Sequence, residues 1–403
     1  MKVAAIIAEY NPFHNGHEYH VKKTREAGYS HIIAIMSGDY VQRGSPAIAD
    51  MFVRAKAAVD CGVDLVIALP LPWSMSAAPD FAKGAVTIIK ATGITDCISF
   101  GCETKETDSF QKYADLFQDE VLQEEIKKQC KTGISYPNAV CNACKTTNND
   151  QLIKLLETPN NLLGLEYCKH LVGTDIKILP IERIGCNHND SKPDGEFASA
   201  SAIREQFYNM YNYDPELYIL YTLIPKASLA VLQEAEKQGF FPLDLNKFDL
   251  AVTSRLRLLQ PEDYTNIPYI AGGLENRFYN AVLQSECFTT ACDSAKSKNI
   301  THARVRRSLL CAALQIKQQH FSQSVPYLRI LASNKRGHEI LNVMRKTCKI
   351  PIIMKHSDSK YLDSYAKEIY DLNMKANDLY SLCLPKPTAC GQSASHTIYI
   401  KKD

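Results

Sequence analysis

The stretch that decides the fold opens the chain: Val3-Ala4-Ala5-Ile6-Ile7-Ala8, followed by Glu9-Tyr10-Asn11-Pro12-Phe13-His14-Asn15-Gly16-His17. The first six residues are all apolar, which is typical of a short strand buried on both faces of a sheet. A polar segment with a helical pattern begins at about His17. Ligands of open α/β sheets bind beyond the carboxyl ends of the strands, so residues 9–17 are expected to line a ligand site.

Strand and helix patterns alternate through the first hundred residues. Apolar runs at 2–8, 31–36, 64–69 and 97–100 predict strands, and amphipathic segments from about 17, at 50–61 and at 79–92 predict the helices between them. Such alternation indicates a parallel sheet with right-handed crossovers. We therefore expect an α/β fold with a Rossmann-like, doubly wound parallel sheet.

The rest of the chain divides into two parts. Helical patterns at 108–131 and 149–171 precede another apolar run at 176–181, which predicts one more strand of the same sheet, and residues 183–196 have the composition of a loop. From about Tyr211 the pattern is mainly helical. We predict a nucleotide-binding domain at 1–210 and a mainly α-helical carboxyl-terminal domain at 211–403.

Composition narrows the class of protein. The 403 residues carry a net charge of +2, and no apolar run approaches the roughly 20 residues that cross a bilayer. The 14 cysteines are scattered and follow no export signal, so reduced thiols in the cytoplasm, and no membrane partner, are expected. A structural zinc site needs four ligands; the single pair Cys141 and Cys144 has no companion, so no metal site is predicted.

His14, Gly16 and His17 form the most informative pattern. Glycine removes a side-chain obstruction, a helix amino terminus offers backbone donors, and two imidazoles can donate to phosphate oxygens. Donors of this kind favour a transition state in which negative charge builds on phosphorus and on departing pyrophosphate. These residues therefore predict a nucleoside triphosphate site.

A second phosphate-binding pattern lies at Ser199, Ser201 and Arg204. Serines before a helical pattern can cap its start, and backbone amides there can hold an anion. An arginine in the first turn adds paired donors. We expect this turn to hold the distal phosphates.

Residues 301–350 have a one-sided charge. One acidic residue, Glu339, stands against ten basic ones: Arg304, Arg306, Arg307, Lys317, Arg329, Lys335, Arg336, Arg345, Lys346 and Lys349. Phosphate contacts supply most of the affinity of RNA-binding proteins. Tyr327 and His302 could stack on unpaired bases. This segment is predicted to contact RNA.

The H-x-G-H run resembles the motif of HIGH-type nucleotidylyltransferases, and the chain as a whole resembles bacterial tRNA(Met) cytidine acetate ligases. The resemblance rests on AEYNPFHNGH at 8–17, SGDYVQRG at 37–44, PNNLLGLEY at 159–167, FASASAIR at 197–204 and GLENR at 273–277. It implies that acetate and ATP, with Mg²⁺, give acetyl-adenylate and pyrophosphate, and that the acetyl group then passes to the N4 amine of the wobble cytidine in elongator tRNA(Met). The first domain would then bind ATP and the second tRNA.

The resemblance also implies roles for particular residues. His14 and His17 would be catalytic. The expected ATP contacts are Ile7, Glu9, Tyr10, Asn11, Pro12, Phe13, His14, Gly16, His17, His20, Gly101, Asn160, Asn161, Arg183, Ile184, Ser199, Ser201 and Arg204. The expected RNA contacts are Arg43, Arg304, Arg306, Arg307, Lys335 and Arg336.

Two other functions are compatible with the same phosphate motifs. One is an adenylyltransferase for a small phosphorylated metabolite, of the pantetheine-phosphate or nicotinamide-mononucleotide type, which would not need a large basic second domain. The other is a non-catalytic RNA-binding scaffold that keeps a nucleotide fold. Turnover separates them, because a scaffold releases no pyrophosphate.

Overall fold

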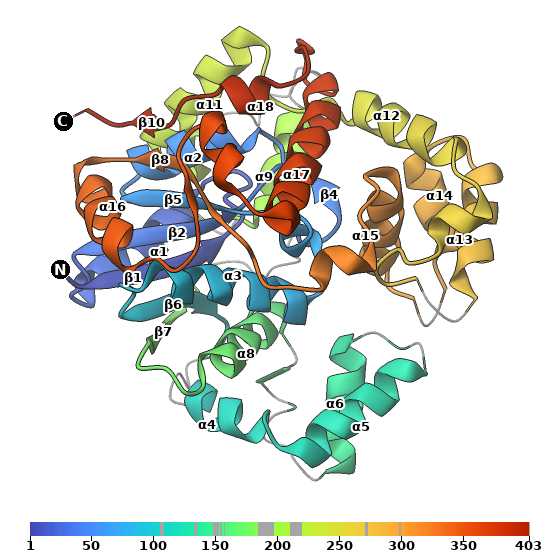
Figure 1. Ribbon diagram of the computed structural model, residues 1–403, viewed down its shortest axis with the longest axis horizontal. Coiled ribbons are helices and arrows are strands. Elements are labelled where there is room, and N and C mark those ends of the chain that lie inside the picture. Colours follow the sequence, from blue (N-terminus) through green and yellow to red (C-terminus); the bar gives the residue numbers. More distant parts are fainter. Residues whose placement is uncertain are drawn as a thin grey trace.

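A central sheet with helices on both faces organises the protein, which is a computed structural model. It describes residues 1–104, 109–132, 134, 136–147, 153, 155–156, 158–183, 197–209, 220–270, 273–297 and 300–402, without the side chains at 109, 111–113, 159 and 221. Figure 1 shows the sheet on one side of the molecule and a group of helices, α12 to α15, on the other.

The sheet has the strand order β10-β8-β5-β2-β1-β6-β7, and β9 pairs with β8. Neighbouring strands from β5 to β7 run parallel, whereas β8 runs antiparallel to β5. The strands are β1 (Val3–Ala8), β2 (His31–Ser37), β5 (Leu65–Leu69), β6 (Cys97–Cys102), β7 (Lys177–Glu182), β8 (Leu328–Ser333), β9 (Ile352–Ile353) and β10 (Tyr399–Ile400). A separate two-stranded sheet joins β3 (Tyr40–Val41) to β4 (Ser45–Pro46).

The helices of the first half follow the predicted alternation: α1 (Asn15–Glu26), α2 (Met51–Asp60), α3 (Ala78–Thr92), α4 (Ser109–Leu116), α5 (Glu120–Lys131), α6 (Tyr136–Thr146), α8 (Pro159–Leu171) and α9 (Ala200–Asn209). Among these described helices, α6 lies where no helix was predicted. The second half contains α10 (Leu220–Leu223), α11 (Lys226–Gln238), α12 (Leu245–Arg257), α13 (Leu274–Leu283), α14 (Phe288–Ala295), α15 (His302–Ala313), α16 (Lys335–Thr347), α17 (Ser364–Leu382) and α18 (Gln392–Ser395). Short 3₁₀ turns lie at Trp73–Met75, Pro261–Tyr264, Gln318–Phe321 and His356–Tyr361.

Alternate residues of each strand point to opposite faces of the sheet, and each face has its own core. Ile33 and Ile35 of β2 belong to a cluster with α3, α8 and α16, whereas Ile32 and Ala34 belong to one with α1 and α2. Strands buried on both faces need apolar residues at every position, which explains the unbroken apolar runs in the sequence. The doubly wound fold is confirmed.

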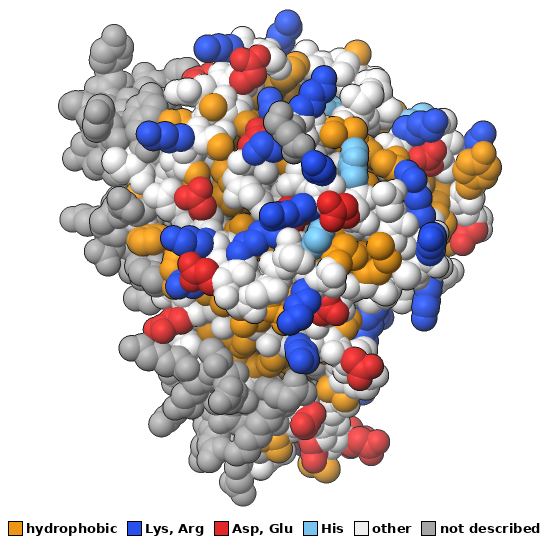
Figure 2. Space-filling model, turned by 90° about the vertical axis from the view of Figure 1, so that its left-hand side faces the viewer, with side chains coloured by type: hydrophobic (Ala, Val, Ile, Leu, Met, Phe, Trp, Pro, Cys, Tyr) orange, Lys and Arg blue, Asp and Glu red, His pale blue; other side chains and the backbone are white. Residues whose placement is uncertain are grey.

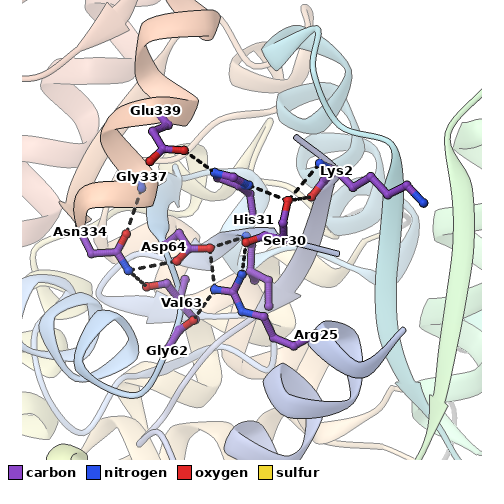
Figure 3. A network of polar contacts seen from close by, with 11 residues as sticks. Lys2, Arg25, Ser30, His31, Gly62, Val63, Asp64, Asn334, Gly337 and Glu339 are labelled. Carbon is purple, nitrogen blue, oxygen red and sulfur yellow. Dashed lines mark hydrogen bonds and ion pairs between the residues drawn. The ribbon is translucent and has the colours of Figure 1, made fainter. Parts of the chain in front are cut away.

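The carboxyl-terminal region contributes strands that the sequence analysis did not predict. β8 pairs with β5, and β10 pairs in turn with β8. Figure 3 shows how the end of β8 is fastened: Asn334 donates to Asp64 Oδ1 (3.0 Å), and Arg25 donates to Asp64 Oδ2 (2.6 Å). The side chain of His31 lies between Ser30 and Glu339 of α16. This polar network joins α1, β2, β5 and α16.

Helices α12 to α15 and α17 form a further core, which lies against the loops that follow β2 and β5. Helix α17 binds the first of these loops directly. Asn377 donates to Asp39 Oδ2 (2.7 Å), and Tyr40 donates to the carbonyl of Ala376 (3.0 Å). The predicted domain boundary between 210 and 211 lies outside the described residues. No helix in the described ranges is long and apolar enough to cross a membrane.

Candidate active site

Residues 9–17 lie at the point where the strand order reverses. β1 has β2 on one side and β6 on the other, so the crossover connections on the two sides of β1 run in opposite directions. A crevice opens at such a point beyond the carboxyl ends of the strands. Helix α1 begins at Asn15, directly above it.

The two motif histidines are held by backbone groups of their own turn. His14 is the N-cap of α1, and its Nδ1 accepts a hydrogen bond from the Gly16 amide (3.1 Å). His17 Nδ1 accepts from the His14 amide (3.2 Å). A neutral imidazole whose Nδ1 accepts carries its proton on Nε2. Both rings, with centroids 3.8 Å apart, therefore present Nε2–H donors.

Burial keeps these imidazoles neutral. It is the main cause that lowers the pKa of His14 to about 3, and the charges of Arg183 and Arg204 lower it further. The pKa of His17 is well below its usual value for the same main reason. Burial and then Arg183 lower the pKa of His20 to about 4. At neutral pH the histidines are hydrogen-bond donors, and the two arginines supply the positive charge.

Gly16 leaves room for the His14 ring. A Cβ atom at this position would lie 2.9 Å from His14 Cε1 and 3.1 Å from Nδ1. Carbon atoms pack at about 3.5 Å or more, so any side chain here would displace the ring. The glycine of the motif is therefore required by the histidine two residues earlier.

The residues between β1 and His14 build the turn. Tyr10 and Phe13 are each 1% exposed, and their rings pack together at 4.8 Å. Pro12 is buried, and Asn11, 2% exposed, accepts from the Ile48 amide (2.8 Å). These four residues were expected to contact ATP, and the structure buries the side chains of all four. Ile7 is half-buried at the end of β1.

Arg54 is a supporting residue that sequence reasoning missed. It is 1% exposed and donates to the carbonyls of Ala49 (2.9 Å), Glu9 (2.5 Å) and Gly38. One guanidinium thus ties the start of the motif to the loops after β2 and before α2. Its position in the apolar face of α2, MFVRAKAAVD, was the available signal.

The second phosphate motif meets the first. Ser199 Oγ accepts from the Ala202 amide (3.1 Å), caps α9 and lies 2.9 Å from the hydroxyl of Ser201. Arg204 donates to the carbonyl of Asn11 (2.7 Å). The start of α9 and the turn before His14 are therefore in direct contact, as a shared phosphate site requires.

The end of β6 forms the other wall of the crevice. The side chain of Asn161, 3% exposed, accepts from the Glu103 amide (3.0 Å), and Asn160 donates to the Glu103 carboxylate. These bonds fix the first turn of α8 beside Gly101.

Arg183 follows β7 and is exposed. The Arg183 amide donates to the carbonyl of Cys102 (2.9 Å). The Arg183 side chain passes so close to Gly101 that a Cβ there would lie 3.3 Å from Arg183 Cγ. His20 Nε2 lies 2.7 Å from the hydroxyl of Ser99, one turn below His17. Ile184 lies outside the described residues.

Comparisons with known proteins agree with this geometry. A family model described as HIGH Nucleotidyl Transferase matches residues 1–395. The tRNA(Met) cytidine acetate ligase of Acetivibrio thermocellus is 34% identical over 99% of this chain and 100% of its own, and that of a Thermoanaerobacter species is 35% identical over 99% of each. The chain belongs to the tRNA(Met) cytidine acetate ligase family.

Solved structures of this ligase family have the same fold. Thermotoga maritima TmcAL without ligand is 30% identical and superposes with a TM-score of 0.91 over 100% of both chains. The same protein bound with alpha-thio ATP gives a TM-score of 0.90, with 30% identity and the same coverage. The match includes the helical carboxyl-terminal region as well as the sheet.

Three of the residues expected to bind RNA lie on α15, which meets the loop after β2. Arg306 donates to the carbonyl of Arg43 (3.3 Å), and Arg307 donates to that of Gln42 (3.2 Å). The Gln42 amide in turn donates to Glu9 Oε1 (3.1 Å). Gly44, with φ +73°, passes so close that a Cβ would lie 2.6 Å from the Arg307 amide. Part of the arginines' donor capacity therefore holds this loop beside the nucleotide motif.

Arg304, the third, donates to the carbonyl of Tyr269 (3.1 Å) and is half-buried, whereas Arg43 is exposed. Lys335 and Arg336 are exposed but begin α16, where Asn334 binds Asp64 at the amino end of β5. They lie at the amino ends of the parallel strands, whereas His14 lies beyond their carboxyl ends. On the molecular face that carries α16, Lys and Arg side chains are scattered among acidic ones (Figure 2).

One expectation for the basic segment was wrong. Tyr327 is 1% exposed and packs on Tyr370 in the core, so it cannot stack on an RNA base. Arg329, another residue of the basic segment, lies in β8 and is 8% exposed. His302 is partly exposed and lies 2.9 Å from Asp293.

Proposed function

We propose that the protein acetylates the wobble cytidine of elongator tRNA(Met), using acetate and ATP. An acetate oxygen attacks the α-phosphorus, the bond to the β-phosphate oxygen breaks, and pyrophosphate leaves. The N4 amine of cytidine then attacks the acetyl carbonyl carbon, loses a proton, and AMP leaves. The family supports this assignment through the activity that its members' names state.

The observation that carries the proposal is the paired Nε2–H donors of His14 and His17. In the first step negative charge moves onto the α-phosphate oxygens and the departing pyrophosphate. Fixed neutral donors in a buried site stabilise such charge without reorganisation. Arg204 and Ser199, at the start of α9, are suited to the distal phosphates. Arg183 is suited to pyrophosphate because its side chain is exposed at the crevice.

Mg²⁺ belongs to the proposal as a companion of ATP. The described residues include no group of three or more His, Cys, Asp or Glu side chains placed to bind a metal ion. The side chains at the crevice are mostly imidazoles, hydroxyls and guanidinium groups, which are poor Mg²⁺ ligands. The phosphates would therefore hold the ion, which would neutralise part of their charge.

The RNA is proposed to approach along the loop at 42–44 and helix α15. Arg43, Arg304, Arg306 and Arg307 meet there, and the loop is bonded to Glu9 of the nucleotide motif. Lys335 and Arg336 lie at the amino ends of the parallel strands, far from this loop, so they could contact only a different part of the tRNA.

The test combines two assays on the purified protein. Acetate-dependent exchange between ATP and labelled pyrophosphate reports the first step, and label from acetate in tRNA acetylcytidine reports both. His14→Ala and His17→Ala should lose each activity by at least about 100-fold. His338→Ala, an exposed histidine of α16, is the matched control.

Other results identify other functions. Pyrophosphate release that requires a phosphorylated metabolite in place of acetate would indicate a small-molecule adenylyltransferase. Binding of tRNA without pyrophosphate release under any condition would indicate a scaffold. Either result would contradict the proposal.

A further inference from the structure

A small pocket beside β8 has no role in the activity described above. Its polar lining comes from four segments: Arg329 of β8, Lys355 and His356 at the 3₁₀ turn after β9, Tyr370 of α17, and His396 after α18. Phe52 and apolar residues of β8 and β9 complete the walls. We call it the Arg329 pocket. None of the described residues that line it is acidic.

The floor of the pocket is a buried cation. Arg329 is 8% exposed, and in the described part of the chain its guanidinium forms no ion pair. One hydrogen bond, from Nη2 to the carbonyl of Ser393 (2.6 Å), uses one of its five N–H groups. The guanidinium also lies near the rings of Phe52 (5.3 Å) and Tyr370 (5.8 Å). Asp39 acts on this guanidinium only through its charge, without an ion pair. Burying a charge without a direct partner is unfavourable, so contact with an anion would stabilise Arg329.

The rim adds donors that are open to solvent. Lys355, His356 and His396 are exposed. His356 Nδ1 lies 3.1 Å from the Tyr370 hydroxyl, and His396 stacks on Phe52 with centroids 3.7 Å apart. These contacts hold both imidazoles at the pocket mouth.

The acidic groups nearest the pocket are engaged elsewhere. Asp358 accepts from the amides of Met354 (2.9 Å) and Lys355 (3.0 Å), so its carboxylate is turned to the main chain. Asp39, on the other side of Arg329, accepts from the Met51 amide and from Asn377. The cations of the pocket therefore keep their donors for a ligand.

We propose that the Arg329 pocket binds a phosphate group of the RNA backbone. Donors from four segments match an anion with several oxygens in tetrahedral arrangement better than a planar carboxylate with two. The position also fits. Arg329 pairs with Ala68 near the carboxyl end of β5. His14 also lies beyond the carboxyl ends of the parallel strands, whereas Lys335 and Arg336 lie at the amino ends. The source of the phosphate, RNA, rests on the function proposed above; the phosphate site itself does not.

The deciding variant changes the rim only, because Lys355 and His396 are exposed and outside the nucleotide site. Lys355→Ala combined with His396→Ala should weaken tRNA binding about five- to tenfold and reduce the slope of log affinity against log salt by about one. Lys360→Ala, which removes the same charge from the same 3₁₀ turn outside the pocket, should change affinity less than twofold. Pyrophosphate exchange without RNA should be unchanged in both variants.

Inorganic phosphate serves as the direct probe. In the wild type it should shift the NMR signals of the His356 and His396 imidazoles and, at constant ionic strength, compete with tRNA; the rim variant should lose the competition. Phosphate binding with unaltered tRNA affinity in the rim variant would mean a free phosphate ligand and overturn the assignment to RNA. If the wild type bound no phosphate and the rim variant kept its tRNA affinity, the proposed phosphate site would be refuted. Failure of wild-type exchange would contradict the proposed activity alone, since these binding assays need no turnover.

Discussion

Replacing Gly16 by alanine separates catalysis from folding. The new Cβ would lie 2.9 Å from His14 Cε1, so the ring must retreat by at least about 0.6 Å to reach ordinary carbon contact. That movement breaks or bends the bond from the Gly16 amide to His14 Nδ1 and turns Nε2–H away from the phosphate. A misplacement of about 1 Å, or the loss of one such donor, lowers rates by roughly 100-fold. We expect a loss of that size in the kcat of pyrophosphate exchange.

The unfolding free energy of Gly16→Ala should change little, or increase slightly. Alanine in a helix is about 0.5–1 kcal/mol more favourable than glycine, which offsets the displaced ring. Urea unfolding of Gly16→Ala should therefore stay within about 1 kcal/mol of wild type. Gly38→Ala is the control, because its Cβ would meet no atom closer than 3.9 Å, and it should keep its exchange rate. An exchange rate for Gly16→Ala within threefold of wild type would refute the role assigned to the His14 ring.

Two further predictions concern buried polar groups. Because the pKa values of His14 (about 3) and His20 (about 4) lie below the unfolded value of about 6.5, the unfolded chain binds more protons, so stability should fall as pH drops from about 6.5 towards 4. Urea unfolding at several pH values should show this slope, and His20→Gln should reduce it; an unchanged slope would contradict the low pKa of His20. Asp64→Asn should lose about 2–3 kcal/mol of unfolding free energy, because the Asp64 carboxylate accepts from Arg25 and the Ile32 amide (2.7 Å). A loss below about 0.5 kcal/mol would show that the network in Figure 3 contributes little.

The sequence predicted the nucleotide-binding half of the fold well, because its signals are local. Unbroken apolar runs mark strands buried on both faces, and the run at 3–8 followed by Pro12 and Gly16 fixes where the first strand ends. The tautomers of His14 and His17 could not be predicted, since they depend on which backbone amides the rings accept from. Arg54 was missed for a similar reason: only its environment distinguishes it from an exposed helical arginine.

Strand β8 shows where local patterns fail. Six apolar-rich residues, Leu328–Ser333, lie among helices, and periodicity alone does not separate a short buried strand from a helix. Its partner β5 lies more than 250 residues earlier in the chain. Missing this strand also led to the expectation that Tyr327 stacks on RNA bases, whereas its side chain is buried in the core.

Because β8 pairs with β5, the sheet stays incomplete during most of the synthesis of the chain. The edge of β5, Leu65–Leu69, is made early on the ribosome, but the strand that covers it is translated only after residue 327. Until then the nascent chain presents an unpaired apolar strand, the kind of edge on which other chains can assemble. A protein released before that point would keep its His14 and His17 and still lack the strand that closes its sheet.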